Sequence, residues 1–314
     1  MSATPKITPI VSPWGRFGLY SFFIDAPEPA IVDTGIRISP RDGIAPALED
    51  LGRSLAEIRW ILVTHGHPDH VGGAVAAWEA TGRRAQVAIH SADADLLRSR
   101  EAHVKSYVRL RQRYLNDPNG VAKQEAMATE VISGEMEPSI ELHGGETLSL
   151  GGDVTVSVHH TPGHTPGSVT FVLDQVNAAF VGDATQINGA ANGFPGYEDP
   201  IAYRASLQYL RDEVKPSRMF LGHHFRNGAG EPFDIELHGA DAMRAIQESL
   251  DIESKIGEYA HKQWEQGLSN EGSPYDPFAS VADDMGYLAD PTLEPSPFFV
   301  TLNGYRQQFE KDQT

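Results

Sequence analysis

Four potential metal ligands lie close together in this sequence, directly after a mostly apolar run. Residues 64–73 read THGHPDHVGG, and the candidate ligands are His65, His67, Asp69 and His70. The run at 58–63 predicts a short strand that is buried on both faces. Pro68 cannot simply continue that strand, and the alanine-rich stretch at 71–80 predicts a helix. This pattern indicates an α/β fold with metal ligands at the carboxyl end of a strand.

Three further segments place a potential ligand after a strand or in a tight turn. His164 lies in TPGHTPGS, between β-like runs at 154–158 and 169–173. Asp183 follows the apolar run at 178–181, and the pair His223 and His224 follows the run at 219–221. Such positions hold side chains at the rim of a sheet, where α/β folds bind ligands. Because adjacent side chains in an extended segment point in opposite directions, we expect only one of this pair to reach a metal.

In order and type, these residues resemble the ligand motif of the metallo-β-lactamase superfamily. The IVDTG segment at 31–35 is also similar to an early strand end of that family, and the resemblance covers roughly residues 7–225. It implies an α/β fold of four layers, an αβ/βα sandwich with the metals at one edge. By the family pattern, one metal is held by His65, His67 and His164, the second by Asp69, His70 and His223, and both are bridged by Asp183. The family's Gly-His ending favours His223 over His224.

The resemblance also implies a reaction. Two divalent ions about 3.5–4 Å apart can share a hydroxide, which attacks an acyl or phosphoryl bond. Zinc is the favoured metal, although ligation by nitrogen and oxygen alone also suits manganese, iron or cobalt. By the resemblance, Asp69 is a candidate catalytic residue as well as a metal ligand. Asp33 is a candidate for orienting a ligand histidine.

A proton donor for the leaving group is harder to place. Some lactonases of the superfamily use a tyrosine between the bridging aspartate and the last histidine, and this interval contains Tyr197, Tyr203 and Tyr209. Tyr197 is the first candidate because its loop lies near the expected metal edge, whereas Tyr209 is expected to be buried in a helix. The remaining histidines match no ligand position and are expected to be structural or surface residues: His90, His103, His143, His159, His160, His238 and His261.

The substrate class stays open at this stage. The dinuclear site suits hydrolysis of a thioester or a lactone of a small molecule. The alternatives are an iron-dependent persulfide-type dioxygenase, a β-lactamase-like hydrolase, and a ligand sensor with weak catalysis.

Length and local patterns predict a catalytic domain at 1–229 and an extension at 230–314. A hairpin is expected at 17–32, and helices at 43–51 and 201–213. Residues 91–140 predict two helices around a turn at 117–120, which form a helical lid over the cleft. The first lid helix is basic, with Arg98, Arg100, Lys105, Arg109, Arg111 and Arg113. It either attracts an anionic substrate or simply forms a solvated face.

Composition narrows the partners and the location. The formal net charge of −18 argues against a nucleic-acid partner, and the absence of cysteine excludes thiolate ligands. We see no apolar run of about 18 residues and no secretion signal, so we expect no membrane partner and a cytoplasmic location. The extension carries an apolar stripe at Met243, Ile246, Leu250, Ile256 and Tyr259, which predicts a helix that docks on the domain or forms a homodimer.

Overall fold

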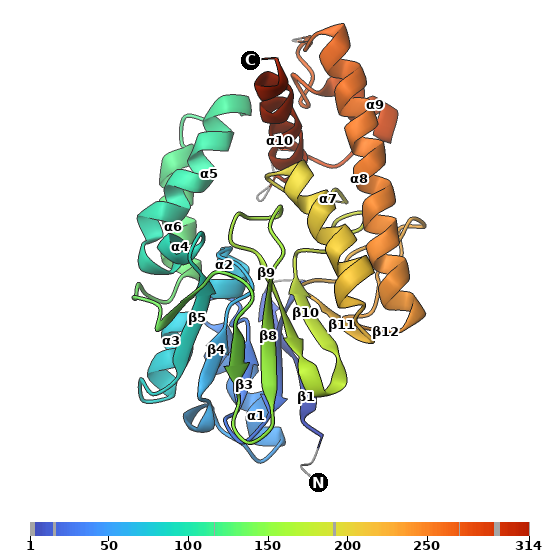
Figure 1. Ribbon diagram of the computed structural model, residues 1–314. Coiled ribbons are helices and arrows are strands. Elements are labelled where there is room, and N and C mark those ends of the chain that lie inside the picture. The colour runs from blue at the N-terminus through green and yellow to red at the C-terminus, as the bar shows by residue number, and fades with distance from the viewer. Residues whose placement is uncertain are drawn as a thin grey trace.

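The computed structural model describes residues 4–313, apart from 15–16, 116, 191–192, 270 and 292–295. Two six-stranded sheets form its centre (Figure 1). The first sheet contains, in spatial order, β1 (Lys6–Trp14), β2 (Phe17–Asp25), β3 (Ala30–Val32), β4 (Trp60–Leu62), β5 (Gln86–His90) and β6 (Ile140–Leu142). The second contains, in the order β12 to β7, β12 (Glu236–His238), β11 (Arg218–Leu221), β10 (Ala178–Gly182), β9 (Val169–Leu173), β8 (Thr155–His160) and β7 (Thr147–Ser149).

Strand direction brings several loops to one edge of the sandwich. Strands β3 to β6 are parallel in the first sheet, and β10 and β11 are parallel in the second. The hairpin of β2 and β3 is antiparallel, with Phe22 opposite Val32, which confirms the predicted hairpin. Because the carboxyl ends of parallel strands meet at one edge, the loops after β3, β4 and β5 start side by side.

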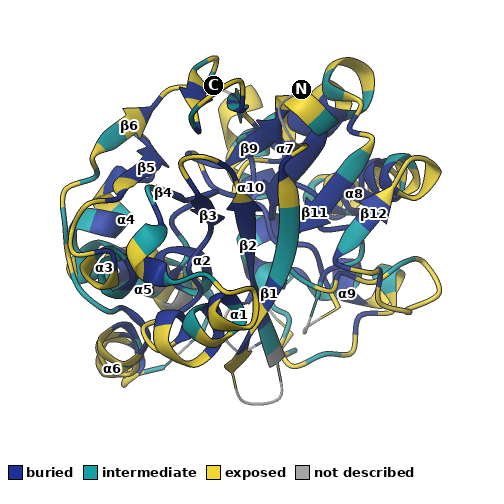
Figure 2. Cartoon of the chain, turned by 90° about the horizontal axis from the view of Figure 1, so that it is seen from below, coloured by how far each residue is buried: buried dark blue, intermediate teal, exposed yellow. Residues whose placement is uncertain are grey.

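The two sheets pack face to face, with helices on both outer faces. Phe22 of the first sheet packs against both Phe180 and Phe220 of the second, with its ring centroid 5.4 and 5.2 Å from theirs. On the outer face of the first sheet, Ile61 and Val87 pack with residues of α1, α3 and α4. Central strands such as β3, β9 and β10 are therefore buried, while edge strands such as β1 and the outer sides of the helices are partly exposed (Figure 2). These layers confirm the predicted αβ/βα sandwich.

The helices agree with the predicted positions but differ in their ends, and the first predicted lid helix is divided at Ser99 into two helices. They are α1 (Ala45–Asp50), α2 (Pro68–Val71), α3 (Ala74–Ala80), α4 (Ala94–Arg98), α5 (Arg100–Tyr114), α6 (Gly120–Val131), α7 (Pro200–Tyr209), α8 (Ala240–Gln266), α9 (Ala279–Met285) and α10 (Pro297–Asp312). The helix predicted at 71–80 is present from Ala74 to Ala80, and only its beginning differs, because the chain turns at Gly72 and Gly73 between α2 and α3. A Cβ atom at Gly73 would lie 2.3 Å from the Thr34 carbonyl oxygen, so the backbone at 34–36 packs directly on this turn.

The lid segment and the extension approach each other beyond the sheets. Helices α5 and α10 rise on opposite sides of the β8–β9 loop (Figure 1). They meet where the ring of Tyr114 stacks on Phe299, at 5.1 Å between centroids, and its hydroxyl donates to Asn303 Oδ1 at 2.8 Å. The apolar stripe of α8 packs inside the same chain, since Ile246, Leu250 and Ile256 are buried in one apolar cluster with residues of α7, α9 and α10. The division at residue 229 stays a prediction.

Among the helices that the structure describes, none combines the length and the apolar character needed to cross a membrane.

Candidate metal centre

The loop after β4 carries four of the predicted ligands. His65 follows the strand and is buried, and His67 occupies the position just before the first turn of α2, with Pro68 as the first residue of that helix. Proline suits this position because a backbone N–H at the first residue of a helix has no partner within the helix, so its absence costs no hydrogen bond. Asp69 and His70 then lie in the single turn of α2, so a strand end and a helical turn bring their side chains to one place.

The first ligand group consists of His65, His67 and His164. His164 Nε2 lies 3.2 Å from His65 Nε2 and 2.9 Å from His67 Nδ1. Ligand atoms at about 2.1 Å from a tetrahedral ion lie about 3.4 Å from one another. The three imidazole nitrogens therefore have the spacing of ligands around one ion.

The second group consists of Asp69, His70 and His223. His223 Nε2 lies 3.2 Å from His70 Nε2 and 3.2 Å from Asp69 Oδ2. Asp183 lies beside both groups, with one oxygen 3.6 Å from His164 Nε2 and 3.6 Å from His223 Nε2, and the other 3.5 Å from His70 Nε2. Asp183 Oδ1 is buried and has no hydrogen-bond donor. A buried carboxylate oxygen without a donor is costly unless a cation satisfies it, so this donor set fits divalent metal.

Asp33 holds one of these histidines in place. Its carboxylate is buried after β3 and accepts from the Thr64 N–H and the Thr64 hydroxyl, each at 2.8 Å. Asp33 Oδ2 also lies 2.8 Å from His70 Nδ1. This bond keeps the proton on Nδ1 and leaves Nε2 free to bind a metal, which is the orienting contact expected from the sequence.

The two groups differ in their electrostatics. Burial lowers the pKa of His67 to about 3, and the charge of His164 adds to this effect. Burial also lowers the pKa of His164 to about 4. For His70, burial acts in the same direction, but Asp33, Asp69 and Asp183 outweigh it and raise the pKa to about 10. The first group is therefore neutral at pH 7, whereas a cation that binds the second group displaces a proton.

Two residues near the first group were missed from the sequence. Asp93, at the start of α4, accepts hydrogen bonds from both loops that carry this group. Gln186 Nε2 lies 2.7 Å from His164 Nδ1, and Gly196 donates its N–H to Gln186 Oε1 at 2.6 Å. Asp93 follows β5 at the ligand edge of the sheet, and that position is the only signal the sequence offers for it.

The candidate tyrosines lie in different surroundings from those expected. Tyr197 is fully buried, stacks on Tyr203 and forms a hydrogen bond with the Tyr305 hydroxyl at 3.3 Å. Burial raises its pKa well above the ordinary value. Its hydroxyl is engaged with α10, so this geometry adds no support for a role as proton donor. The expectation that Tyr209 is buried was wrong, because it lies on the exposed side of α7 and pairs with His159 at 2.8 Å.

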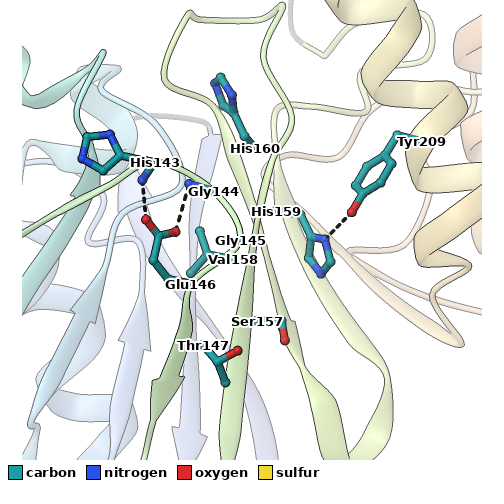
Figure 3. A pocket seen from close by; sticks show the side chains of 10 residues that line it. All are labelled: His143, Gly144, Gly145, Glu146, Thr147, Ser157, Val158, His159, His160 and Tyr209. Atoms are coloured by element: carbon teal, nitrogen blue, oxygen red, sulfur yellow. Dashed lines mark hydrogen bonds between the residues drawn. The ribbon is translucent and has the colours of Figure 1, made fainter.

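Other histidines form contacts away from the ligand groups. His224 Nδ1 donates to the Phe233 carbonyl at 2.8 Å, and His224 packs on Tyr20, so it is His223 that joins the second group. Beside β7 and β8, a pocket of about 370 Å³ is lined by His143, His159 and His160 (Figure 3). Within the described part of the chain, none of these three belongs to a group that could hold a metal ion.

A layered α/β sandwich with a histidine and aspartate centre at its strand ends defines a class of metal-binding proteins. The sequence profile of the metallo-beta-lactamase superfamily matches residues 15–223, about two thirds of the chain. The chain belongs to this superfamily.

Several relatives and solved structures are similar to the chain. It is 28% identical to the YobT protein of Bacillus subtilis over 62% of this chain and 78% of that protein. It is 29% identical to a hydroxyacylglutathione hydrolase of Acidiphilium cryptum, over 60% of this chain but only 59% of that enzyme. A metallo-beta-lactamase family protein of Thermus thermophilus has the same fold, with a TM-score of 0.67 at 20% identity over 98% of this chain and 93% of the other.

Proposed function

We propose that this protein hydrolyses an acyl bond, with a thioester as the first choice, in a small-molecule substrate. The observation that carries the proposal is the position of Asp183 between two ligand groups. The first ion would be held by His65, His67 and His164, the second by Asp69, His70 and His223, and Asp183 would join them. Zinc is the first choice because imidazole and carboxylate ligands in this spacing suit it.

Divalent ions in such a centre supply a nucleophilic hydroxide at neutral pH and polarise the bond that is cleaved. The residues of the chain orient and insulate this chemistry. Asp33 fixes the ring and the tautomer of His70. Asp69 Oδ2 lies 3.2 Å from His223 Nε2, and the Asp69 side chain is 26% exposed, whereas His70 beside it is buried. Its carboxylate is therefore placed to align a substrate.

The preference for a thioester comes from relatives. Hydroxyacylglutathione hydrolases, by their name, act on thioesters of glutathione, and those of Acidiphilium cryptum and Hyphomonas neptunium are 29% and 27% identical to this chain. The chain covers only 59% and 46% of their lengths, so their substrate is a proposal for this protein.

An anionic substrate has less support from the lid. Arg98 pairs with Asp95, Glu137 and Glu141, and Lys105 pairs with Glu101 at 2.7 Å. These ion pairs favour the interpretation of the basic helix as a solvated face. The acidic chain as a whole still favours a small-molecule partner over a nucleic acid.

The test combines metal analysis with a substrate panel. Purified protein is analysed for metal by mass spectrometry and assayed with glutathione thioesters, lactones, β-lactams and phosphodiesters. We expect two metal ions per chain and hydrolysis of at least one thioester, with kcat/KM reduced at least about 100-fold in His67→Ala. His143→Ala is the matched control, because His143 lies outside the ligand groups, and it should retain activity within about twofold.

Each other outcome identifies an alternative. Preference for a lactone or a β-lactam would replace the thioester as substrate. Activity that requires iron and oxygen would indicate a dioxygenase. A fully metallated protein that turns over none of these compounds would refute the hydrolase proposal and favour a ligand sensor.

A further inference from the structure

The first ligand group depends on the relative position of two loops that are far apart in sequence. His65 and His67 lie in the loop after β4, and His164 lies in the loop between β8 and β9. At their base, the loops are joined by the bond from the Val169 N–H to the Thr64 carbonyl, at 2.9 Å. A base contact alone leaves the outer parts of both loops unfixed, and the ligands lie in those outer parts.

Asp93 joins the loops there. One carboxylate oxygen, Oδ2, accepts from the Gly66 N–H at 2.8 Å and from the Thr165 hydroxyl at 2.7 Å. The other oxygen, Oδ1, accepts from the Gly167 N–H at 2.8 Å. Gly66 lies between His65 and His67, Thr165 directly follows His164, and Gly167 lies three residues beyond His164, so every donor is close to a ligand in the sequence.

The surroundings of Asp93 are built for this contact. The residue is 1% exposed. A Cβ atom at Gly167 would lie 2.5 Å from the carboxylate carbon of Asp93, so only glycine allows this approach of the backbone. Asp93 belongs to none of the ligand groups among the described residues, so its bonds to the loops are its contribution to the centre.

We propose that Asp93 is a positioning residue that sets the geometry of His65, His67 and His164 by fixing the β4–α2 loop against the β8–β9 loop. The inference rests on the proposed metal centre. It also makes the start of the lid segment part of that centre, because Asp93 begins α4. The second group is held separately, since Asp33 fixes His70 without any contact from Asp93.

A carboxylate is required because all three partners donate. In Asp93→Asn, one oxygen becomes an NH₂ group, which faces either the Gly167 N–H or the Gly66 N–H and breaks that link. Loss of such a supporting bond typically weakens metal binding about 10–100-fold. We expect this loss in the first group and less than about threefold in the second.

The experiment measures metal affinity in variants that retain one ligand group. His223→Ala leaves the first group intact, and His164→Ala leaves the second. Zn²⁺ and Co²⁺ affinities are measured in each background by competition with a chelator, together with the visible absorption spectrum of bound Co²⁺. Asp93→Asn should weaken binding and alter the spectrum in the His223→Ala background only.

Two further variants serve as control and reserve. Asp95→Asn changes an exposed carboxylate of α4 that pairs with Arg98 at 3.2 Å, and it should leave affinity and spectrum unchanged. If Asp93→Asn fails to fold, Thr165→Val removes one of the three bonds, and we expect a loss of about fivefold in the first group.

Unchanged affinity of the first group would overturn the inference, as would an equal loss in both backgrounds, which indicates a general structural role. Failure of the unmodified protein to bind metal would refute the proposed function and this inference together. A metal-binding protein that tolerates Asp93→Asn would refute the inference alone.

Discussion

Gly222 offers a way to disturb the metal centre without removing a ligand atom. It lies between β11 and His223, and its N–H donates to the Gly182 carbonyl at 2.9 Å. A Cβ atom there would lie 2.2 Å from Asp183 Oδ1 and 2.9 Å from the Gly182 carbonyl oxygen. Gly222 does not have a positive φ, so alanine is excluded by the clash and not by its backbone conformation.

The size of the effect follows from that distance. A carbon atom approaches a carboxylate oxygen to about 3.3 Å, so Gly222→Ala forces Asp183 or the backbone to move by about 1 Å. Ligand distances tolerate only about 0.2 Å. A displacement of about 1 Å near reacting groups costs on the order of 100-fold in rate. We therefore expect Gly222→Ala to lose metal on dialysis and to reduce kcat/KM about 100-fold.

Gly228→Ala is the matched control, six positions further along the chain. Apart from its chain neighbours, no residue that the structure describes lies within 4 Å of a Cβ atom at Gly228, and its φ is not positive. This variant should keep its metal and be as stable as the parent or more stable by about 0.4–1 kcal/mol. Metal content, far-UV circular dichroism and the thermal midpoint are compared. A folded Gly222→Ala protein with full metal content and normal activity would show that the reasoning is wrong.

Three further predictions concern protons, the lid and the choice of ligand. Metal binding at pH 8 should release a proton from His70, whose pKa is raised to about 10, so the apparent metal affinity should increase as the pH rises from 7 towards 10. Titrations in weakly buffered indicator solution measure this proton release. A metal affinity that does not depend on pH would contradict the prediction. Tyr114→Phe removes a hydrogen bond of about 1 kcal/mol to Asn303. The backbone amides of α5 should therefore exchange about fivefold faster in hydrogen-exchange mass spectrometry, while the metal content stays constant. Unchanged exchange would show that α10 does not restrain α5. His223→Ala should lose metal, whereas His224→Ala should not, because His224 bonds to the Phe233 carbonyl; similar losses in both variants would count against His223.

The sequence predicted most of the sandwich because its signals are local. The strands at 169–173 and 178–182 are short apolar runs, and the structure contains both. The predicted ligands also lie close together. Each either follows a strand that ends at the same edge of the sandwich or lies in a loop between two strands at that edge.

The parts that were missed depend on contacts between distant segments. Asp93 looks like an ordinary residue before a short helix, and its role appears only when Gly66 and Gly167 are brought to it. The break between α2 and α3 arises because the backbone at 34–36 packs on Gly73, which an alanine-rich helical pattern does not reveal. The environment of Tyr197 is set by Tyr305, which is 108 residues away along the chain.

The centre takes its ligands from both sheets. His65 and His70 follow a strand of the first sheet, whereas Asp183 and His223 follow strands of the second. Each of the two proposed ions would take ligands from both sheets and would therefore cross-link two layers that otherwise adhere through side chains such as Phe22 and Phe180. At a free metal concentration 1,000 times the dissociation constant, such a ligand stabilises the folded state by about 4.1 kcal/mol. A higher free metal concentration should therefore raise the resistance of the folded protein to heat and to proteases, apart from any effect on catalysis.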